Sequence, residues 1–170
     1  MTHAPARPET LSETLRTPRR QLMNNPMFDW ARRRIMRRRL AALQVALMLG
    51  VCSAAAAIDV VGQTAMISTM IALLIPMIVT MGHLNASIRG LTELKTGDLD
   101  EWQISRRDAT YRACWWPAIA FMGVTSGLAS FGLPYPGLAP GLFLLGFFTA
   151  ISLPVLTLAW SLPDEPGEMS

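Results

Sequence analysis

The stretch TELKTGDLDEWQISRRDAT, residues 92–110, separates two strongly apolar regions and decides how they divide into helices. It carries both acids and bases, whereas runs without Asp, Glu, Lys or Arg cover residues 40–58 and 60–88 before it and 113–163 after it. Only 16% of the 170 residues are charged, against about 25% in an ordinary soluble domain. This composition indicates a membrane protein with a polar connection at its centre.

The apolar runs are long enough for four membrane spans, because one spanning helix needs about 20 apolar residues. The last run can supply two spans, since the segment GLPYPGLAPG, residues 132–141, interrupts it with three prolines and three glycines, which do not continue a helix. We therefore predict an all-α fold, a four-helix transmembrane bundle with spans at residues 40–59, 63–84, 114–133 and 141–162 of a membrane domain covering 40–162.

The basic residues lie on one side of these spans. Ten of the 15 Lys and Arg residues fall within residues 1–39, and the other five lie between the second and third spans. By the positive-inside rule, both termini and the central connection face the cytoplasm. We expect a multi-pass protein of a bacterial cytoplasmic (inner) membrane. Its first span should remain as an anchor, because the basic region before it is too long for a secretory signal.

The central connection is predicted to be a cytoplasmic helical hairpin over residues 84–113. Apolar residues spaced by three and four continue the second span into it, and Gly97 suits the left-handed residue that ends a helix. Asp98 and Glu101 then fit a capping box that starts the next helix. The charges of the hairpin are candidates for docking a partner, with a merely solvated surface as the alternative: Asp98, Asp100, Glu101, Arg106, Arg107 and Asp108.

The chain ends in an acidic tail over residues 163–170. At the other end, the N-terminal region divides into two parts. Residues 1–25 are polar, so we predict a disordered cytoplasmic arm. Residues 26–39 are predicted to form a basic interfacial helix, in which each arginine adds about 1 kcal/mol of attraction to anionic lipid. Simple topological anchoring is the alternative. The candidate lipid-binding residues are Arg32, Arg33, Arg34, Arg37, Arg38 and Arg39.

Two patterns inside the spans suggest further contacts. Gly123 and Gly127 form a G-x-x-x-G pair that lets another helix approach closely, either within the bundle or from a second copy in a homo-oligomer. Four methionines lie on roughly one face of the second span, and soft thioethers bind Cu(I), as in copper importers that this M-x-x-x-M pattern resembles. Methionine also fills apolar cores. The four are Met66, Met70, Met77 and Met81.

The segment DLDEWQISRRDATYRA, residues 98–113, resembles the L-D-E-x-Q/E segment followed by spaced arginines in small integral membrane proteins of actinobacteria. The resemblance covers these residues and the arrangement of helices. Most proteins of that group have no assigned function, so the resemblance implies a membrane location and no site residues.

The chain shows none of the common signatures of an enzyme. We find no nucleophile–base pair, no phosphate loop and no HExxH motif. Between their ends the spans hold no ionisable residue of the kind that proton-coupled transporters use, since Asp59 lies at the outer edge of the first span and His83 near the cytoplasmic boundary of the second. We expect a non-enzymatic accessory or regulatory subunit of a bacterial membrane protein complex, with no catalytic residue, metal or cofactor. Its expected partners are anionic membrane lipids and other membrane protein subunits, but not nucleic acid. A small transport protein, with Cu(I) as its cargo, and an uncharacterised membrane enzyme are the alternatives.

Overall fold

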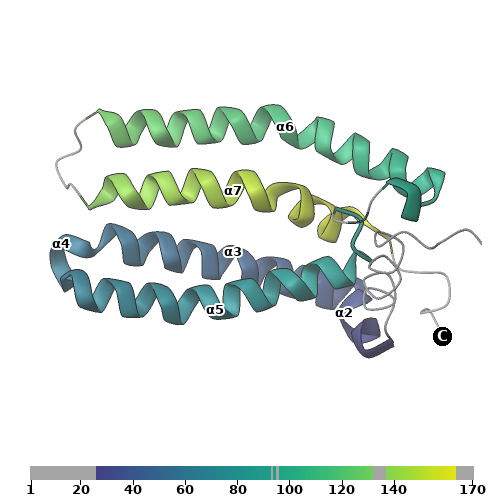
Figure 1. The fold of residues 1–170 in the computed structure, drawn as a ribbon, viewed down its shortest axis with the longest axis horizontal. Coiled ribbons are helices and arrows are strands. Elements are labelled where there is room, and N and C mark those ends of the chain that lie inside the picture. The colour runs from purple at the N-terminus through teal and green to yellow at the C-terminus, as the bar shows by residue number, and fades with distance from the viewer. Residues whose placement is uncertain (1–25, 93, 95, 132–136, 164–170) are drawn as a thin grey trace, which may run out of the picture.

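In the computed structural model, the described part of the chain has four long helices that lie side by side (Figure 1). The structure describes residues 26–131, except residues 93 and 95, and residues 137–163, so the predicted arm (1–25) and most of the acidic tail lie outside it. The described part contains no strand, and the all-α prediction is confirmed. The long helices are α3 (Arg34–Ala56), α5 (Gln63–Ser87), α6 (Glu101–Ser130) and α7 (Leu138–Ser161). The short ones are η1 (Pro26–Phe28), α2 (Asp29–Arg32), α4 (Ile58–Val61) and η2 (Thr96–Asp98).

Among the described helices, α3, α5 and α7 are long and apolar enough to cross a membrane. They coincide with the first, second and fourth predicted spans, although α3 begins at Arg34, within the segment predicted as a separate interfacial helix. The third predicted span falls within α6, whose 30 residues begin with a charged segment. The prediction of a helical membrane protein is thus supported by three candidate spans.

The long helices form a row in the order α6, α7, α3, α5 (Figure 1). The central helix α7 packs against both α6 and α3, and α3 also packs against α5. Contacts between α5 and α7 are few, so α6 is joined to the other helices mainly through α7.

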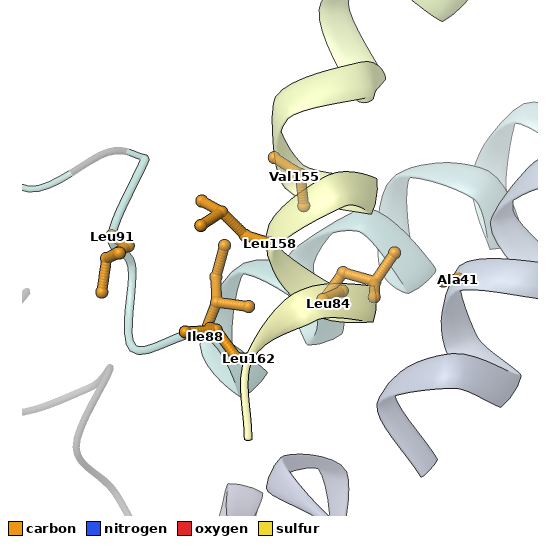
Figure 2. Close-up of a cluster of buried hydrophobic side chains, with 8 residues drawn as sticks. Ala41, Leu84, Ile88, Leu91, Val155, Leu158 and Leu162 are labelled. Carbon is orange, nitrogen blue, oxygen red and sulfur yellow. The ribbon is translucent and has the colours of Figure 1, made fainter. Parts of the chain in front are cut away.

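The hydrophobic core consists of two clusters along this row. The first cluster joins Leu84 and Ile88 near the end of α5 to Leu158 on α7, all nearly inaccessible to solvent (Figure 2). The second joins Met48 and Val51 on α3 to Met77 on α5. Of the other methionines of the predicted stripe, Met70 packs against the second cluster and Met81 against the first. Three of the four methionines therefore contribute to the core, while copper binding stays a prediction.

Glycines on α7 allow its neighbours to approach closely. A Cβ atom at Gly141 would lie 2.8 Å from the carbonyl oxygen of Cys52 and 2.9 Å from the Cβ of Ala56 on α3. A Cβ atom at Gly146 would overlap Thr125 Oγ1 and lie 3.2 Å from the Cα of Met122 on α6. The missing side chains at Gly141 and Gly146 therefore set the distance of α7 from both neighbouring helices.

The N-terminal segment bends instead of forming one interfacial helix. Arg33 is extended (φ −58°, ψ 131°), which separates α2 from α3. The bend returns η1 and α2 to the end of α5, where the rings of Phe28 and Trp30 lie 5.9 and 5.8 Å from the ring of His83. The basic run is thus divided between a short folded-back segment and the first turns of a membrane-length helix.

The helix α5 ends earlier than the apolar spacing predicts. The N–H of Gly90 donates to the carbonyl of Asn85 (2.8 Å) and the N–H of Arg89 donates to that of Ala86 (3.1 Å), the two bonds of a Schellman motif. Arg89 (φ 54°) and Gly90 (φ 66°) both adopt the left-handed conformation. The predicted first arm of the hairpin is therefore wrong beyond Ser87, since Leu91 reaches the core from this turn and not from a longer helix.

The helix α6 begins two residues later than predicted. The carboxylate of Asp100 accepts a bond from the N–H of Gln103 (2.7 Å), and the Asp100 N–H donates to Gln103 Oε1 (3.1 Å). These reciprocal bonds form a capping box. The predicted box of Asp98 and Glu101 is wrong, because Asp98 belongs to η2 and Glu101 is already the first residue of α6. The side chain of Asp98 lies outside the described part of the structure.

Alanine substitutions at Gly90 and Gly97 should have different effects on stability. Gly90→Ala should destabilise the fold by about 1 to 2 kcal/mol, because an L-residue in the left-handed region costs roughly that amount. Gly97→Ala should have little effect, since Gly97 does not have a positive φ and an added Cβ meets no atom within 4 Å. Unfolding of the two purified variants in detergent measures the difference. Equal losses would contradict the observed position of the chain reversal.

Candidate functional site

The predicted docking and lipid-binding residues lie where α3 and α6 begin, close to the ends of α5 and α7 (Figure 1). We call this region the charged end. The first core cluster lies beside it and includes Leu162, directly after α7, and Leu91, directly after the α5 turn (Figure 2). The backbone at the charged end is thus held by apolar burial close to the polar residues.

Two of the six arginines predicted to bind lipid are buried against the protein. Arg37 is only 3% exposed, and its Nη2 donates to the carbonyl oxygens of Leu162 (2.5 Å) and Pro163 (3.0 Å). A cation at the C-terminus of a helix satisfies its last carbonyls and complements the negative end of the helix dipole. Arg32 is 8% exposed and forms an ion pair with Asp29. These two arginines are occupied with contacts inside the fold.

The other four arginines present charge at the surface. Arg33, Arg34 and Arg39 are exposed, and Arg38 is half-buried. The guanidinium carbon of Arg38 lies 4.8 Å from the ring centroid of Trp160 on α7, within the range of a cation–π contact. A role in lipid binding stays a prediction for these residues.

Among the residues predicted to dock a partner, Arg107 holds the connection between α5 and α6. Its Nη1 donates to the carbonyl of Leu94 (3.2 Å), its Nη2 donates to Thr96 Oγ1 (3.1 Å), and its Nε donates to Asp108 Oδ1 (3.2 Å). The contacts with Leu94 and Thr96 link η2, and the residue two positions before it, to the second turn of α6. Arg107 is therefore a structural residue of the charged end.

The remaining docking candidates differ in their surroundings. Asp100 is the N-cap of α6, Glu101 is exposed, and the side chain of Asp108 is 53% exposed. Arg106 is half-buried, and its Nε is enclosed without a hydrogen-bond partner. The described members of the predicted cluster thus lie around the start of α6, and Asp100, Glu101 and Asp108 are all exposed.

A pocket of about 250 Å³ opens at the charged end, between the start of α6 and the ends of α5 and α7. Its walls include the cations of Arg37 and Arg89, the acid Asp100 and the indole of Trp102. Trp102 is 59% exposed and was not among the predicted docking residues. The sequence itself indicates that Trp102 is exposed, because this tryptophan lies among charged residues more than two helical turns before the apolar part of α6.

The helix α6 contacts the rest of the chain along one narrow line. Of its 30 residues only Thr110, Cys114 and Thr125 are buried. Cys114 Sγ lies 3.4 Å from Thr157 Oγ1 on α7, and Thr125 faces Gly146. Around the rest of its circumference, α6 exposes large apolar residues: Trp115, Trp116, Ile119, Val124 and Leu128.

The predicted helix-packing pair lies in open space on α6. A Cβ atom added at Gly123 or Gly127 would meet no atom within 4 Å. The pair therefore makes no close contact with another described helix, and the close approach of α6 to α7 depends on Gly146 instead. Contact of Gly123 and Gly127 with a second subunit stays a prediction.

In the described part of the chain, no group of three or more His, Cys, Asp or Glu side chains is arranged to hold a metal ion. The charged end presents cations, acids and exposed indoles, of which Trp102 lines the small pocket. Comparison of the chain with protein-family models, with curated proteins and with solved structures gives no match.

Proposed function

We propose that this protein is a non-enzymatic accessory subunit of a bacterial membrane protein complex, which docks its partner along α6 and at the charged end. The proposal includes α6 as a fourth span beside α3, α5 and α7. Its apolar part, residues 113–130, is about 27 Å long at about 1.5 Å per residue, close to the hydrocarbon thickness of about 30 Å. The Cys114–Thr157 and Thr125–Gly146 contacts support this, because they set α6 alongside the candidate span α7.

The exposed side of α6 is the observation that carries the proposal. Lipid tails suffice to cover its apolar part, but they do not reach the polar turns before it. There Trp102 is 59% exposed and Tyr111 is 41% exposed, among charged neighbours. Exposed aromatic residues beside arginine are typical of the residues that contribute most to protein–protein binding. A partner with one membrane helix and a polar segment beyond it would cover both parts of α6.

The charges favour the cytoplasm as the side on which the charged end lies. All 15 Lys and Arg residues of the chain precede α3 or lie within its first turns, or lie between the apolar parts of α5 and α6. A membrane protein retains such residues on the cytoplasmic side. The proposed partner therefore presents its polar segment in the cytoplasm.

Photo-cross-linking from two equally accessible positions tests the docking proposal. A photoreactive amino acid is placed at Val124 on α6 or at Ile78 on α5, which are 60% and 67% exposed. In native membranes the Val124 probe should form a discrete protein adduct, whereas the Ile78 probe should form lipid adducts only. The change Trp102→Ala should reduce the protein adduct at Val124 several-fold while the purified chain keeps its thermal stability.

The mass of the adduct identifies the kind of partner. An adduct with a different protein at Val124 supports the accessory role, whereas an adduct of twice the chain mass identifies a homo-oligomer and replaces that role. Lipid adducts alone at both positions would contradict docking along α6.

A further inference from the structure

A second surface lies between α3 and α7, where an open groove of about 560 Å³ runs along the outside of the helices. Its walls are almost entirely apolar. The α3 side is formed by Ala41, Ala42 and Val45, and the α7 side includes Leu156 and Trp160. The volume is typical of a small-molecule site, which usually measures about 300 to 1,000 Å³. Small side chains on α3 create this space, because Ala42 stands where a larger residue would fill it.

A basic side chain adjoins one wall of the groove. Arg38 lies one turn before Ala42 on α3, and its guanidinium packs on the ring of Trp160, which lines the groove. Arg34 is exposed one turn earlier on the same helix. Residues four apart lie on one face of a helix, so Arg34, Arg38 and Ala42 form a continuous line from charge to apolar surface. Along this line the groove changes from cationic to hydrocarbon-like over about 12 Å.

We propose that this groove binds one anionic phospholipid, with its phosphate at Arg38 and an acyl chain along Ala42 and Val45. Arg38 and the apolar walls together indicate a ligand with both an anionic group and a hydrocarbon chain. An anionic phosphate complements the guanidinium, which offers paired N–H donors, and an acyl chain matches the apolar walls. Basic pockets between transmembrane helices on the cytoplasmic side bind anionic head groups in this way. The inference needs α3 and α7 to lie in a membrane, but it does not depend on partner docking by α6.

The cation–π contact of Arg38 with Trp160 distinguishes this position from the rest of the basic run. Arg39 is exposed on a different face of α3, about 100° around the helix from Arg38. Both arginines attract an anionic membrane surface through their charge, but only Arg38 lies at the groove. A matched pair of substitutions therefore separates a specific site from general attraction.

Native mass spectrometry of the full chain in mild detergent tests the site. Phosphatidylglycerol or phosphatidylcholine of identical acyl chains is added, and bound lipid is counted per chain. The unaltered protein should retain one phosphatidylglycerol with an affinity about 10-fold above that for phosphatidylcholine. Arg38→Gln should weaken phosphatidylglycerol binding about 5-fold, as expected for the loss of about 1 kcal/mol per basic residue, whereas Arg39→Gln should change it less than twofold.

A second variant tests whether an acyl chain lies along Ala42 and Val45. Ala42 is exposed, so Ala42→Phe fills the groove without entering the core, and it should weaken retention of both lipids while thermal stability is unchanged. Equal retention of the two lipids, equal loss in Arg38→Gln and Arg39→Gln, or undiminished binding in Ala42→Phe would each overturn the proposal. Dimerisation of the chain that Ala42→Phe abolishes would also overturn it, because a second copy would then occupy the groove.

Discussion

Replacing Gly146 with leucine is expected to separate α6 from α7 and to destabilise the purified chain by about 3 kcal/mol, the upper part of the usual range for overpacking. Even the first atom of a side chain at this position overlaps Thr125 Oγ1 and lies 3.2 Å from the Cα of Met122. Because the nearest atoms belong to a short side chain and to backbone, the clash is relieved only by moving the helix. The stability of α6 against α7 therefore depends on Gly146.

Two measurements check this expectation. Denaturant unfolding in detergent gives the change in free energy, and a short thiol cross-linker between Cys114 and Thr157→Cys reports whether α6 still lies against α7. In the unaltered protein Cys114 Sγ lies 3.4 Å from Thr157 Oγ1, so cross-linking should be efficient. It should fall strongly in the Gly146→Leu variant.

Gly123→Leu is the matched control, since it makes the same change on the open side of α6. An added Cβ at Gly123 meets no atom within 4 Å, and leucine favours helix formation more than glycine. The purified chain should therefore keep or slightly gain stability. If Gly123→Leu lost as much stability and cross-linking as Gly146→Leu, the contact between α6 and α7 would not depend on Gly146.

These two glycines also show what the sequence could predict. The long helices follow from apolar runs of membrane length, which need no tertiary information. The packing face of α6 does not follow, because G-x-x-x-G states only that a close approach is possible. The sequence contains a second pair, Gly137 and Gly141, within the segment that predicts a helix break. In the structure α7 already begins at Leu138, and Gly141 faces Cys52 and Ala56 on α3.

The end of α5 was mispredicted for a related reason. Leu91 lies at helical spacing from Leu84 and Ile88, and it is buried with them in one cluster (Figure 2). The same burial is reached through a turn in which Arg89 takes the left-handed conformation, at a cost of roughly 1 to 2 kcal/mol for a residue with a side chain. Only packing that outweighs this cost selects the turn. Periodicity alone cannot distinguish it from a longer helix.

The basic run includes one arginine, Arg37, on the buried face of α3. Arg37 lies four residues before Ala41 and seven before Gln44, and all three are buried on the inner face of α3. The buried face of α3 therefore continues at helical spacing back to Arg37, although Arg37 and Gln44 are polar. What the sequence does not contain is the acceptor, because the carbonyls of Leu162 and Pro163 are more than 120 residues away.

Arg37→Met is expected to destabilise the chain by about 3 kcal/mol while leaving its attraction to anionic lipid nearly unchanged. Methionine keeps much of the buried apolar stem but donates no hydrogen bond. The carbonyls of Leu162 and Pro163 would lose a charged donor, and a hydrogen bond to a charged group contributes about 1.5 to 3 kcal/mol. Thermal and denaturant unfolding of the purified chain measure the loss.

Arg39→Met serves as the control, because it removes the same charge from an exposed position of the same helix. It should change stability by less than about 0.5 kcal/mol, as surface substitutions usually do. Salt separates the two roles further. Arg37 is only 3% exposed, so salt screens its contacts weakly. The loss of stability in Arg37→Met should therefore persist at about 1 M salt, where the Debye length is about 3 Å. If high salt removed the difference between the two variants, Arg37 would act as a surface charge and the end of α7 would be held by other contacts.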